Sequence, residues 1–246
     1  MKKLKWGIVG CGRIAEQFCQ DIAYTENGEV YAVAARDADK AKVFAKKYGA
    51  QKAYGGYQAL FHDANVDVVY IATTHNFHFQ NAADAIKAGK HVLCEKPITI
   101  SAQECQALSN LAVKHDVFLM EAMWTYFLPA MLKAKQWVQQ GLIGEIKHVK
   151  VDFGYPMTFD PDGREFNPDL AGGCLLDMGI YPLAISNFFL EQDIDDLHVK
   201  ANIRYLGVED DVTILAKSGN VTVNLATSFK CRLSNHAYII GDKGYI

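Results

Sequence analysis

The sequence has no strong excess of charge of either sign, no long apolar run and no signal-peptide pattern. Lys and Arg number 25 against 28 Asp and Glu, which gives a net charge of −3. This balance creates no field that would attract nucleic acid or an anionic membrane surface. No apolar run approaches the ~20 residues that span a bilayer, and glycines interrupt the apolar stretch that follows the N-terminal lysines. We therefore expect a globular, cytoplasmic protein with no nucleic-acid or membrane partner.

Cysteine is present, but its spacing indicates neither a disulfide framework nor a zinc site. None of the six cysteines forms a C-x-x-C pair. Most lie within apolar segments, which favours reduced thiols packed in a core. The six are Cys11, Cys19, Cys94, Cys105, Cys174 and Cys231.

Proline is absent from the first 96 residues, where apolar runs and amphipathic segments alternate. Apolar runs predict strands at residues 6–9, 30–35, 66–72, 91–94 and 117–120. The near-continuous run at 66–72 is typical of a strand that is buried on both faces. Apolar residues at helical spacing predict helices at residues 14–24, 38–48, 79–88 and 102–115. For the helix at 38–48, Asp37 can cap the start and Gly49 can close the end. This alternation predicts an α/β domain with a doubly wound parallel sheet.

The pattern changes near residue 121, beyond which most of the prolines lie. Helical spacing recurs at residues 130–140 and 175–190, strand-like runs at 146–155, 198–205, 212–216 and 221–229, and a polar loop at 157–171. This order predicts an α+β domain with a mostly antiparallel open sheet. We therefore divide the chain into domains 1–121 and 122–246.

A glycine-rich turn between the first predicted strand and helix points to a bound dinucleotide. The segment Gly10-Cys11-Gly12-Arg13-Ile14-Ala15 fits the pattern G-x-G-x-x-A. The first glycine allows a tight turn, the second lets the backbone approach a pyrophosphate, and the small third residue lets helix and strand pack closely. The N-terminus of the helix faces the phosphates. The plain alternative is a glycine turn without a ligand.

The end of the second predicted strand bears on which dinucleotide binds. Selectivity for NAD calls for an acidic residue there, bonded to the ribose 2′-hydroxyl. Here the strand ends in small residues followed by Arg36, which can pair with a 2′-phosphate and stack on adenine. Asp37 is the alternative ribose ligand, but it is also placed to cap the next helix. We therefore expect NADP, with NAD as the alternative.

Two further motifs follow the glycine turn. Cys94-Glu95-Lys96-Pro97 closes the fourth predicted strand, and residues 172–181 read Gly-Gly-Cys-Leu-Leu-Asp-Met-Gly-Ile-Tyr. Together, the three motifs resemble the Gfo/Idh/MocA oxidoreductases, in an order that runs through almost the whole chain. The resemblance implies an N-terminal Rossmann domain that binds NAD(P), followed by a domain for substrate binding and oligomerisation.

Within that family, residues 120–125 and 179–181 are most similar to the dimeric dihydrodiol dehydrogenases, which also oxidise D-xylose with NADP. The family's usual histidine is here Tyr181, a departure that this branch shares. The resemblance implies hydride transfer between the nicotinamide and a secondary alcohol or carbonyl of a small diol or sugar. It also implies a homodimer. A catalytically inactive dinucleotide-binding sensor, or a reductase of inositol or of an amino-sugar nucleotide, remains an alternative.

The chemistry of alcohol oxidation suggests roles for three residues. The reaction removes a hydride and a proton, and a free tyrosine, with a pKa near 10, is a poor base at neutral pH. A nearby ammonium stabilises a phenolate, so we expect Lys96 to activate Tyr181 as the general acid/base. Asp177 lies four residues before Tyr181, on the same helix face, and can orient the lysine or bind a second substrate hydroxyl. The plain alternatives are a surface ion pair for Glu95 and Lys96 and an ordinary half-buried tyrosine.

Weaker candidates flank these motifs. The resemblance implies that the loop with Thr73, Asn76 and His78 contacts the nicotinamide ribose, and that Glu95 lies at the cofactor. A metal site at His75-x-x-His78 is not expected, because no carboxylate or cysteine completes it. Trp124 is the candidate substrate-binding aromatic residue, while Tyr126 and Phe127 could line the pocket or pack in the core. Asp162 and Arg164 lie in the irregular loop and could meet the substrate, but a solvated loop is the expectation for both.

The C-terminal segment departs from the family pattern. Family members usually extend well beyond the length of this chain, and residues 239–246 read as a strand pair cut at its second member. An interruption there would leave an exposed sheet edge. We therefore expect that part of the second domain is missing.

Overall fold

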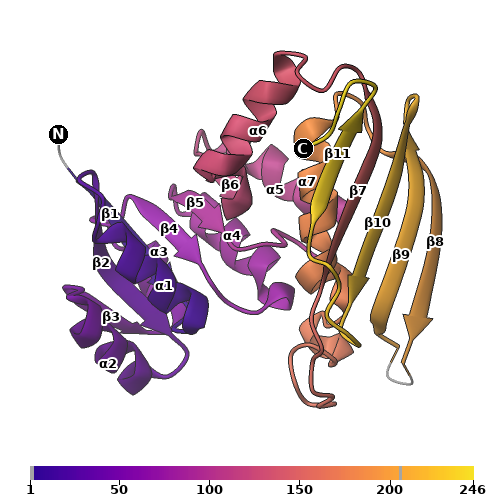
Figure 1. Cartoon of the computed structure of the whole chain (residues 1–246). Coiled ribbons are helices and arrows are strands. Elements are labelled where there is room, and N and C mark those ends of the chain that lie inside the picture. The colour runs from indigo at the N-terminus through magenta and orange to yellow at the C-terminus, as the bar shows by residue number, and fades with distance from the viewer. Residues whose placement is uncertain (1–2, 205–206) are drawn as a thin grey trace. The chain divides into compact units, whose positions relative to one another are not determined.

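The computed structural model describes residues 3–204 and 207–246, and the chain divides into two compact units, Met1–Ala122 and Met123–Ile246. Figure 1 shows the course of the chain through both. In the described part of the chain, every helix is too short or too polar to cross a membrane.

The first unit is built on a parallel sheet with the strand order β3-β2-β1-β4-β5-β6. The strands are β1 (Leu4–Val9), β2 (Gly28–Ala35), β3 (Lys52–Gly55), β4 (Val68–Ile71), β5 (His91–Cys94) and β6 (Leu119–Glu121). The helices are α1 (Arg13–Ile22), α2 (Ala38–Tyr48), α3 (Tyr57–Phe61), η1 (His75–Phe77), α4 (His78–Lys87) and α5 (Ala102–Lys114). This is the strand order of a dinucleotide-binding fold, whose direction reverses between β1 and β4.

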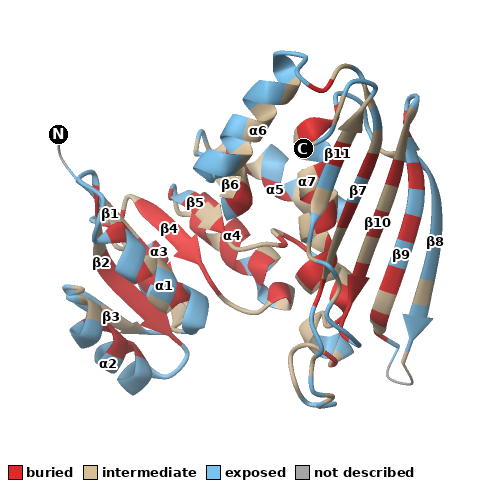
Figure 2. Ribbon diagram, in the orientation of Figure 1, coloured by how far each residue is buried: buried red, intermediate tan, exposed pale blue. Residues whose placement is uncertain are grey.

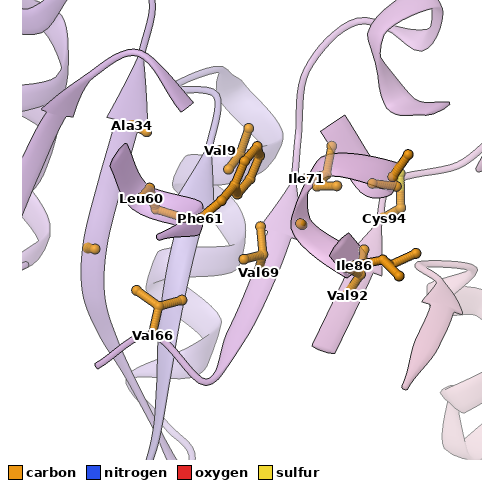
Figure 3. Packing of buried hydrophobic residues seen from close by; sticks show 14 of the residues in the cluster. Val9, Ala34, Leu60, Phe61, Val66, Val69, Ile71, Ile86, Val92 and Cys94 are labelled. Carbon is orange, nitrogen blue, oxygen red and sulfur yellow. The ribbon is translucent and has the colours of Figure 1, made fainter. Parts of the chain in front are cut away.

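Separate apolar clusters cover the two faces of this sheet. One contains Val9, Ile71 and Val92 of the strands together with Leu60 and Phe61 of α3 (Figure 3). The other packs Ile8, Val33 and Tyr70 against α1 and α2. Each fully buried large side chain stabilises the fold by roughly 1.5–3 kcal/mol. The prediction of a doubly wound parallel sheet is therefore confirmed.

Local sequence accounts for α2 at both ends. The Asp37 carboxylate accepts hydrogen bonds from the backbone N–H groups of Asp39 and Lys40 at 2.8 and 3.2 Å. Gly49 closes the helix in the left-handed conformation, with φ +71°. The predicted bounds of this helix are the observed ones, because both end signals are encoded next to it.

The sequence prediction missed β3 and α3. Strand β3 has four residues, lies at the sheet edge and has no buried residue, so it carries no apolar run. Helix α3 has five residues, fewer than two turns, which is too short for helical periodicity to show.

The second unit contains a five-stranded sheet with the order β11-β7-β10-β9-β8. Its strands are β7 (Ile146–Gly154), β8 (Asp195–Ile203), β9 (Glu209–Ser218), β10 (Val221–Ser228) and β11 (Ala237–Gly241). Only β7 and β10 pair in parallel, and the other pairs are antiparallel. The prediction of a mostly antiparallel sheet is therefore confirmed. Tyr205, at the end of the predicted strand 198–205, lies outside the described residues.

Burial alternates along β9, as expected for a strand with one covered face (Figure 2). Val212, Ile214 and Ala216 are buried in the core of this unit, whereas Leu215 is half exposed on the other face. The helical segments of the unit are η2 (Trp124–Phe127), α6 (Pro129–Gln139), η3 (Pro168–Leu170), η4 (Leu175–Gly179) and α7 (Ile180–Phe189).

The predicted helix 175–190 is present, but it is not a uniform α-helix. Its first turn, η4, is a π-helix, and α7 continues from it. Pro182, in the first turn of α7, has no backbone N–H and so cannot make the regular helical bond to Met178. The π-helical turn carries Asp177, and Tyr181 is the second residue of α7.

The last ten residues form a narrow antiparallel pair. Ile239 and Ile246 exchange backbone hydrogen bonds at 3.0 Å, and Ile240 bridges to Tyr245. Strand β11 pairs with β7 at the sheet edge.

Candidate active site

The predicted cofactor-binding residues of the first unit follow strands that end at one edge of the sheet. The glycine turn follows β1, Arg36 follows β2, the loop with Thr73 follows β4, and Glu95 and Lys96 follow β5. Because all these strands are parallel, their carboxyl ends share that edge. Open α/β sheets bind ligands there, at the point where the strand order reverses.

The glycine turn has the geometry that a pyrophosphate needs. Gly10 has φ +96°, and a Cβ there would lie 2.6 Å from the carbonyl oxygen of Ala72, so only glycine fits. At Gly12 a Cβ would meet nothing within 4 Å, which leaves the backbone open to a ligand. No side chain caps the start of α1, and Ala15 is fully buried against the sheet. Arg13 and Ile14 are exposed beside the turn. These features fit a bound dinucleotide.

At the end of β2 the two candidates for cofactor selectivity differ in their surroundings. The Asp37 carboxylate is held by the backbone of α2 as its cap. The Arg36 side chain is exposed and lies close enough to Tyr57 to lower its pKa, although burial outweighs this effect and raises that pKa overall. Both side chains are exposed at this position, and Oδ1 is the atom of Asp37 that caps α2.

Glu95 is half-buried in the first unit. Its carboxylate accepts a hydrogen bond from the Tyr70 hydroxyl at 2.5 Å and another from the Lys96 backbone N–H at 3.3 Å. Burial raises the pKa of Glu95, partly offset by these bonds and by the Lys96 charge. Tyr70 itself stacks on Phe18 of α1 at a centroid distance of 4.0 Å. Glu95 thus anchors the backbone from which Lys96 projects.

The loops after β4 and β5 are joined through His78. Its ring nitrogens lie 2.7 Å from the carbonyl oxygen of Pro97 and 3.0 Å from that of Thr73, and the side chain is fully buried. On the β4 side, Asn81 donates to the Thr73 hydroxyl at 3.2 Å, and Thr74 donates to Asn76 at 2.8 Å. The geometry gives His78 a bridging position between loops, while its contact with a ribose stays a prediction.

The chain beyond Lys96 is held by a residue that the sequence prediction missed. The peptide bond between Lys96 and Pro97 is cis, and the Glu121 carboxylate accepts a hydrogen bond from the Ile98 N–H at 2.8 Å. Glu121 is the last residue of β6 and lies at the same sheet edge as Lys96. This position was the signal that could have identified it from the sequence.

In the second unit, aromatic residues surround Tyr181. The Trp124 Nε1–H donates to the Tyr181 hydroxyl oxygen at 3.1 Å, and the Phe153 ring lies 5.2 Å from the tyrosine ring, edge to face. Trp124 is 53% exposed, so its ring is accessible to a ligand. Tyr126 instead packs inside the unit: it stacks on Phe188 and donates to the Ala184 carbonyl at 2.9 Å.

Asp177 is paired with an arginine from the loop that was expected to be solvated. The Arg164 Nη1 lies 3.1 Å from Asp177 Oδ1, and Nη2 lies 3.4 Å from Oδ2. The Asp177 side chain is only 14% exposed. The expectation of a solvated loop is therefore wrong for Arg164 and holds for the exposed Asp162. The contact joins residues that are distant in sequence, and one of them lies in an irregular loop. No local sequence pattern could therefore have predicted it.

Among the residues that the structure describes, no group of three or more His, Cys, Asp or Glu is arranged to hold a metal ion. All six cysteines are free thiols, and burial raises the pKa of Cys11, inside the glycine turn, to about 11.

The fold and this set of residues define a dinucleotide-binding oxidoreductase of two domains. The family model "Oxidoreductase family, NAD-binding Rossmann fold" matches residues 4–123, and the model "GFO/IDH/MocA C-terminal domain" matches residues 131–246. The chain belongs to the Gfo/Idh/MocA oxidoreductase family.

Named relatives and solved structures agree with this. The mouse (Mus musculus) trans-1,2-dihydrobenzene-1,2-diol dehydrogenase is 39% identical, over 98% of this chain and 73% of the mouse protein. The Homo sapiens enzyme of the same name is 38% identical, over 99% and 73%. A 3-ketoreductase from Actinomadura kijaniata, solved with NADP and TDP-benzene, is 28% identical with a TM-score of 0.90, over 98% of this chain and 74% of that one. An aldose-aldose oxidoreductase from Caulobacter crescentus, complexed with glycerol, is 25% identical with a TM-score of 0.92, over 99% and 76%.

Proposed function

We propose that the protein is an NADP-dependent dehydrogenase or reductase that acts on a secondary alcohol or carbonyl of a small diol or sugar. The observation that carries the proposal is the Tyr181 hydroxyl, which accepts a hydrogen bond from exposed Trp124 and follows Asp177 by four residues. Such a group can exchange a proton with a substrate hydroxyl. Relatives named for a dihydrodiol and an aldose support a small polyhydroxylated substrate.

The exposed Arg36 supports NADP as the cofactor. A guanidinium can form paired hydrogen bonds with a 2′-phosphate, a group that NAD lacks. The capping role of Asp37 supports the same choice, because its carboxylate is bonded to the backbone of α2. The structure of the Actinomadura ketoreductase with NADP is consistent with it.

We assign the proton transfer to Tyr181, with Lys96 as the cation that stabilises its phenolate. When bound, the nicotinamide supplies the hydride donor or acceptor. The tyrosine hydroxyl gives or takes the proton of the substrate oxygen, and the Trp124 N–H is a second donor to the phenolate. Asp177 accepts a hydrogen bond from a further substrate hydroxyl or from Lys96. His78 is proposed at the nicotinamide ribose together with Thr73, Asn76 and Glu95.

The test of the proposal is an activity screen of the whole chain. The candidate substrates are trans-1,2-dihydrobenzene-1,2-diol, D-xylose, a hexose and myo-inositol, each with NADP and with NAD. We expect oxidation of the dihydrodiol or a pentose, with NADP preferred. Cofactor binding without turnover of any of these substrates, or of the matching carbonyl compounds in the reverse direction, would contradict the proposal and favour a sensor.

We also propose that the protein works as a cytoplasmic homodimer. The outer face of the sheet in the second unit supports this, because Leu215 is half exposed on it. A sheet with one face on its core can use the other as an interface.

A further inference from the structure

The loop between β7 and η4 is folded tightly around a glycine of the third motif. At Gly172 a Cβ would lie 2.8 Å from the Glu165 carbonyl oxygen, 2.9 Å from that of Asn167 and 3.0 Å from that of Arg164. The Gly173 N–H also donates to the Glu165 carbonyl at 2.9 Å. The glycine pair, a few residues before Asp177, therefore fixes the backbone of Arg164 and Glu165.

A buried aromatic residue gives the same loop a second anchor. Phe166 is 1% exposed, and its ring contacts those of Phe159 and Phe229 at 5.1 and 5.5 Å. The N–H groups of Phe166 and Asn167 both donate to the Gly163 carbonyl. Because this anchor is adjacent to Arg164 and Glu165, the arginine is presented from an ordered backbone.

The side chain of Arg164 lies between two carboxylates. It faces both oxygens of Asp177, and its Nη2 lies 3.2 Å from Glu165 Oε1. Burial alone would lower the pKa of Arg164, but the charges and hydrogen bonds of Asp177 and Glu165 outweigh it and raise that pKa. The guanidinium is therefore charged at any working pH, and its planar fork matches the carboxylate.

We propose that Arg164 is a positioning residue that holds the Asp177 carboxylate in one orientation for the substrate. This inference rests on the proposed function, in which Asp177 contacts a substrate hydroxyl. A carboxylate has about four acceptor positions, so the two bonds to Arg164 are compatible with a bond to a hydroxyl. Asp177 then acts as a fixed hydrogen-bond acceptor and not as a proton carrier. The loop arginine thereby contributes to selectivity for a substrate with a second hydroxyl group beside the reacting one.

The experiment is a double-mutant cycle with Arg164→Ala and Asp177→Asn in the full chain. The assay uses NADP with the dihydrodiol or D-xylose, and kcat, KM and NADP affinity are measured separately. We expect Arg164→Ala to lower kcat/KM on the order of 10²-fold, with NADP affinity unchanged within about twofold. In the Asp177→Asn background, the same substitution should change kcat/KM by less than about threefold, because the partner is already altered.

Three further measurements separate positioning from a structural role. Added guanidinium ion should raise the rate of Arg164→Ala at least about tenfold, because the small ion can occupy the space that the arginine side chain leaves. Arg164→Lys keeps the charge but not the fork, so it should be intermediate, and it replaces Arg164→Ala if the alanine variant fails to fold. Lys230→Ala, which removes an exposed ion pair with Asp211 in the same unit, is the control and should match the parent.

The outcomes distinguish this inference from the proposed function. If Asp177→Asn is as active as the parent, the role proposed for Asp177 is wrong. If Asp177→Asn is strongly impaired while Arg164→Ala and Arg164→Lys match the parent, only the inference about Arg164 is overturned. Losses that multiply in the double variant, without guanidinium rescue, would also overturn it.

Discussion

Arg36 and Asp37 are adjacent in sequence, but their side chains differ in their hydrogen-bond partners. The carboxylate of Asp37 is engaged by two backbone N–H groups, whereas the guanidinium of Arg36 is exposed at the carboxyl end of β2. The sequence pattern left both as candidates for contact with the adenosine ribose. The exposed guanidinium supports the proposal that Arg36 contacts the cofactor.

Substitution of Arg36 by alanine should weaken NADP binding and leave NAD binding nearly unchanged. A hydrogen-bonded charged group contributes about 1.5–3 kcal/mol, which corresponds to roughly a 10–100-fold loss of NADP affinity. Titration of both cofactors measures this, and Lys42→Ala, an exposed lysine of α2, is the control. An equal loss for NADP and NAD would refute the assignment.

Substitution of Asp37 by alanine should act on stability and not on cofactor choice. Loss of a helix cap costs about 1 kcal/mol of the free energy of unfolding, and Asp37→Asn should retain most of it. Urea unfolding and the same cofactor titrations test both expectations. If Asp37 were the ribose ligand, Asp37→Ala would instead lower NAD affinity selectively.

At the scale of elements, a partly buried hydrogen bond joins β4 to the segment that follows β5 in the first unit. Tyr70 of β4 donates to Glu95, which follows β5 and precedes Lys96. The pKa of Glu95 is raised by burial, and the Tyr70 bond partly counteracts that shift. The hydrogen bond from Tyr70 stabilises the Glu95 carboxylate more than it stabilises the protonated carboxylic acid.

Tyr70→Phe should therefore destabilise the fold more at high pH than at low pH. Because the folded pKa of Glu95 is already raised, its contribution to stability falls as pH rises from the unfolded value of about 4.3 through the folded pKa. Removing the Tyr70 bond raises that pKa further. We expect a loss of about 1–3 kcal/mol at pH 8 and a smaller one at pH 5, measured by urea unfolding. Tyr24→Phe, at an exposed tyrosine, should show no such pH dependence.

Sequence reasoning succeeded for elements whose signals are local. The helix Ala38–Tyr48 was predicted to the residue because Asp37 and Gly49 mark its ends. The strand His91–Cys94 was also predicted to the residue, because a glycine and a lysine before it and a proline soon after it limit its extent. Contacts such as Arg164 with Asp177 and Tyr70 with Glu95 join residues from different segments, so no periodicity reveals them.

At the scale of the whole molecule, the outer face of the second sheet is the proposed dimer interface. We expect Leu215→Lys to shift the protein toward monomer, because the substitution places a charge on a half-exposed apolar position of that face. Analytical ultracentrifugation at micromolar concentration measures the shift. Val113→Lys, at an exposed position of α5 in the other unit, is the control. A parent that is strictly monomeric under these conditions would contradict the dimer.

In the proposed reaction the Tyr181 hydroxyl carries the proton. Tyr181→Phe removes only that hydroxyl, so NADP affinity should be unchanged. Tyr245→Phe, at an exposed tyrosine of the same unit, is the matched control and should retain the parental rate.

The most direct measurement is kcat of Tyr181→Phe on the best diol or sugar substrate, with NADP affinity measured in parallel. Loss of general acid/base catalysis typically costs ~10²–10⁴ in rate, and we expect a fall in that range with unchanged NADP binding. A kcat within about threefold of the parent would contradict the account and assign the proton transfer to another group.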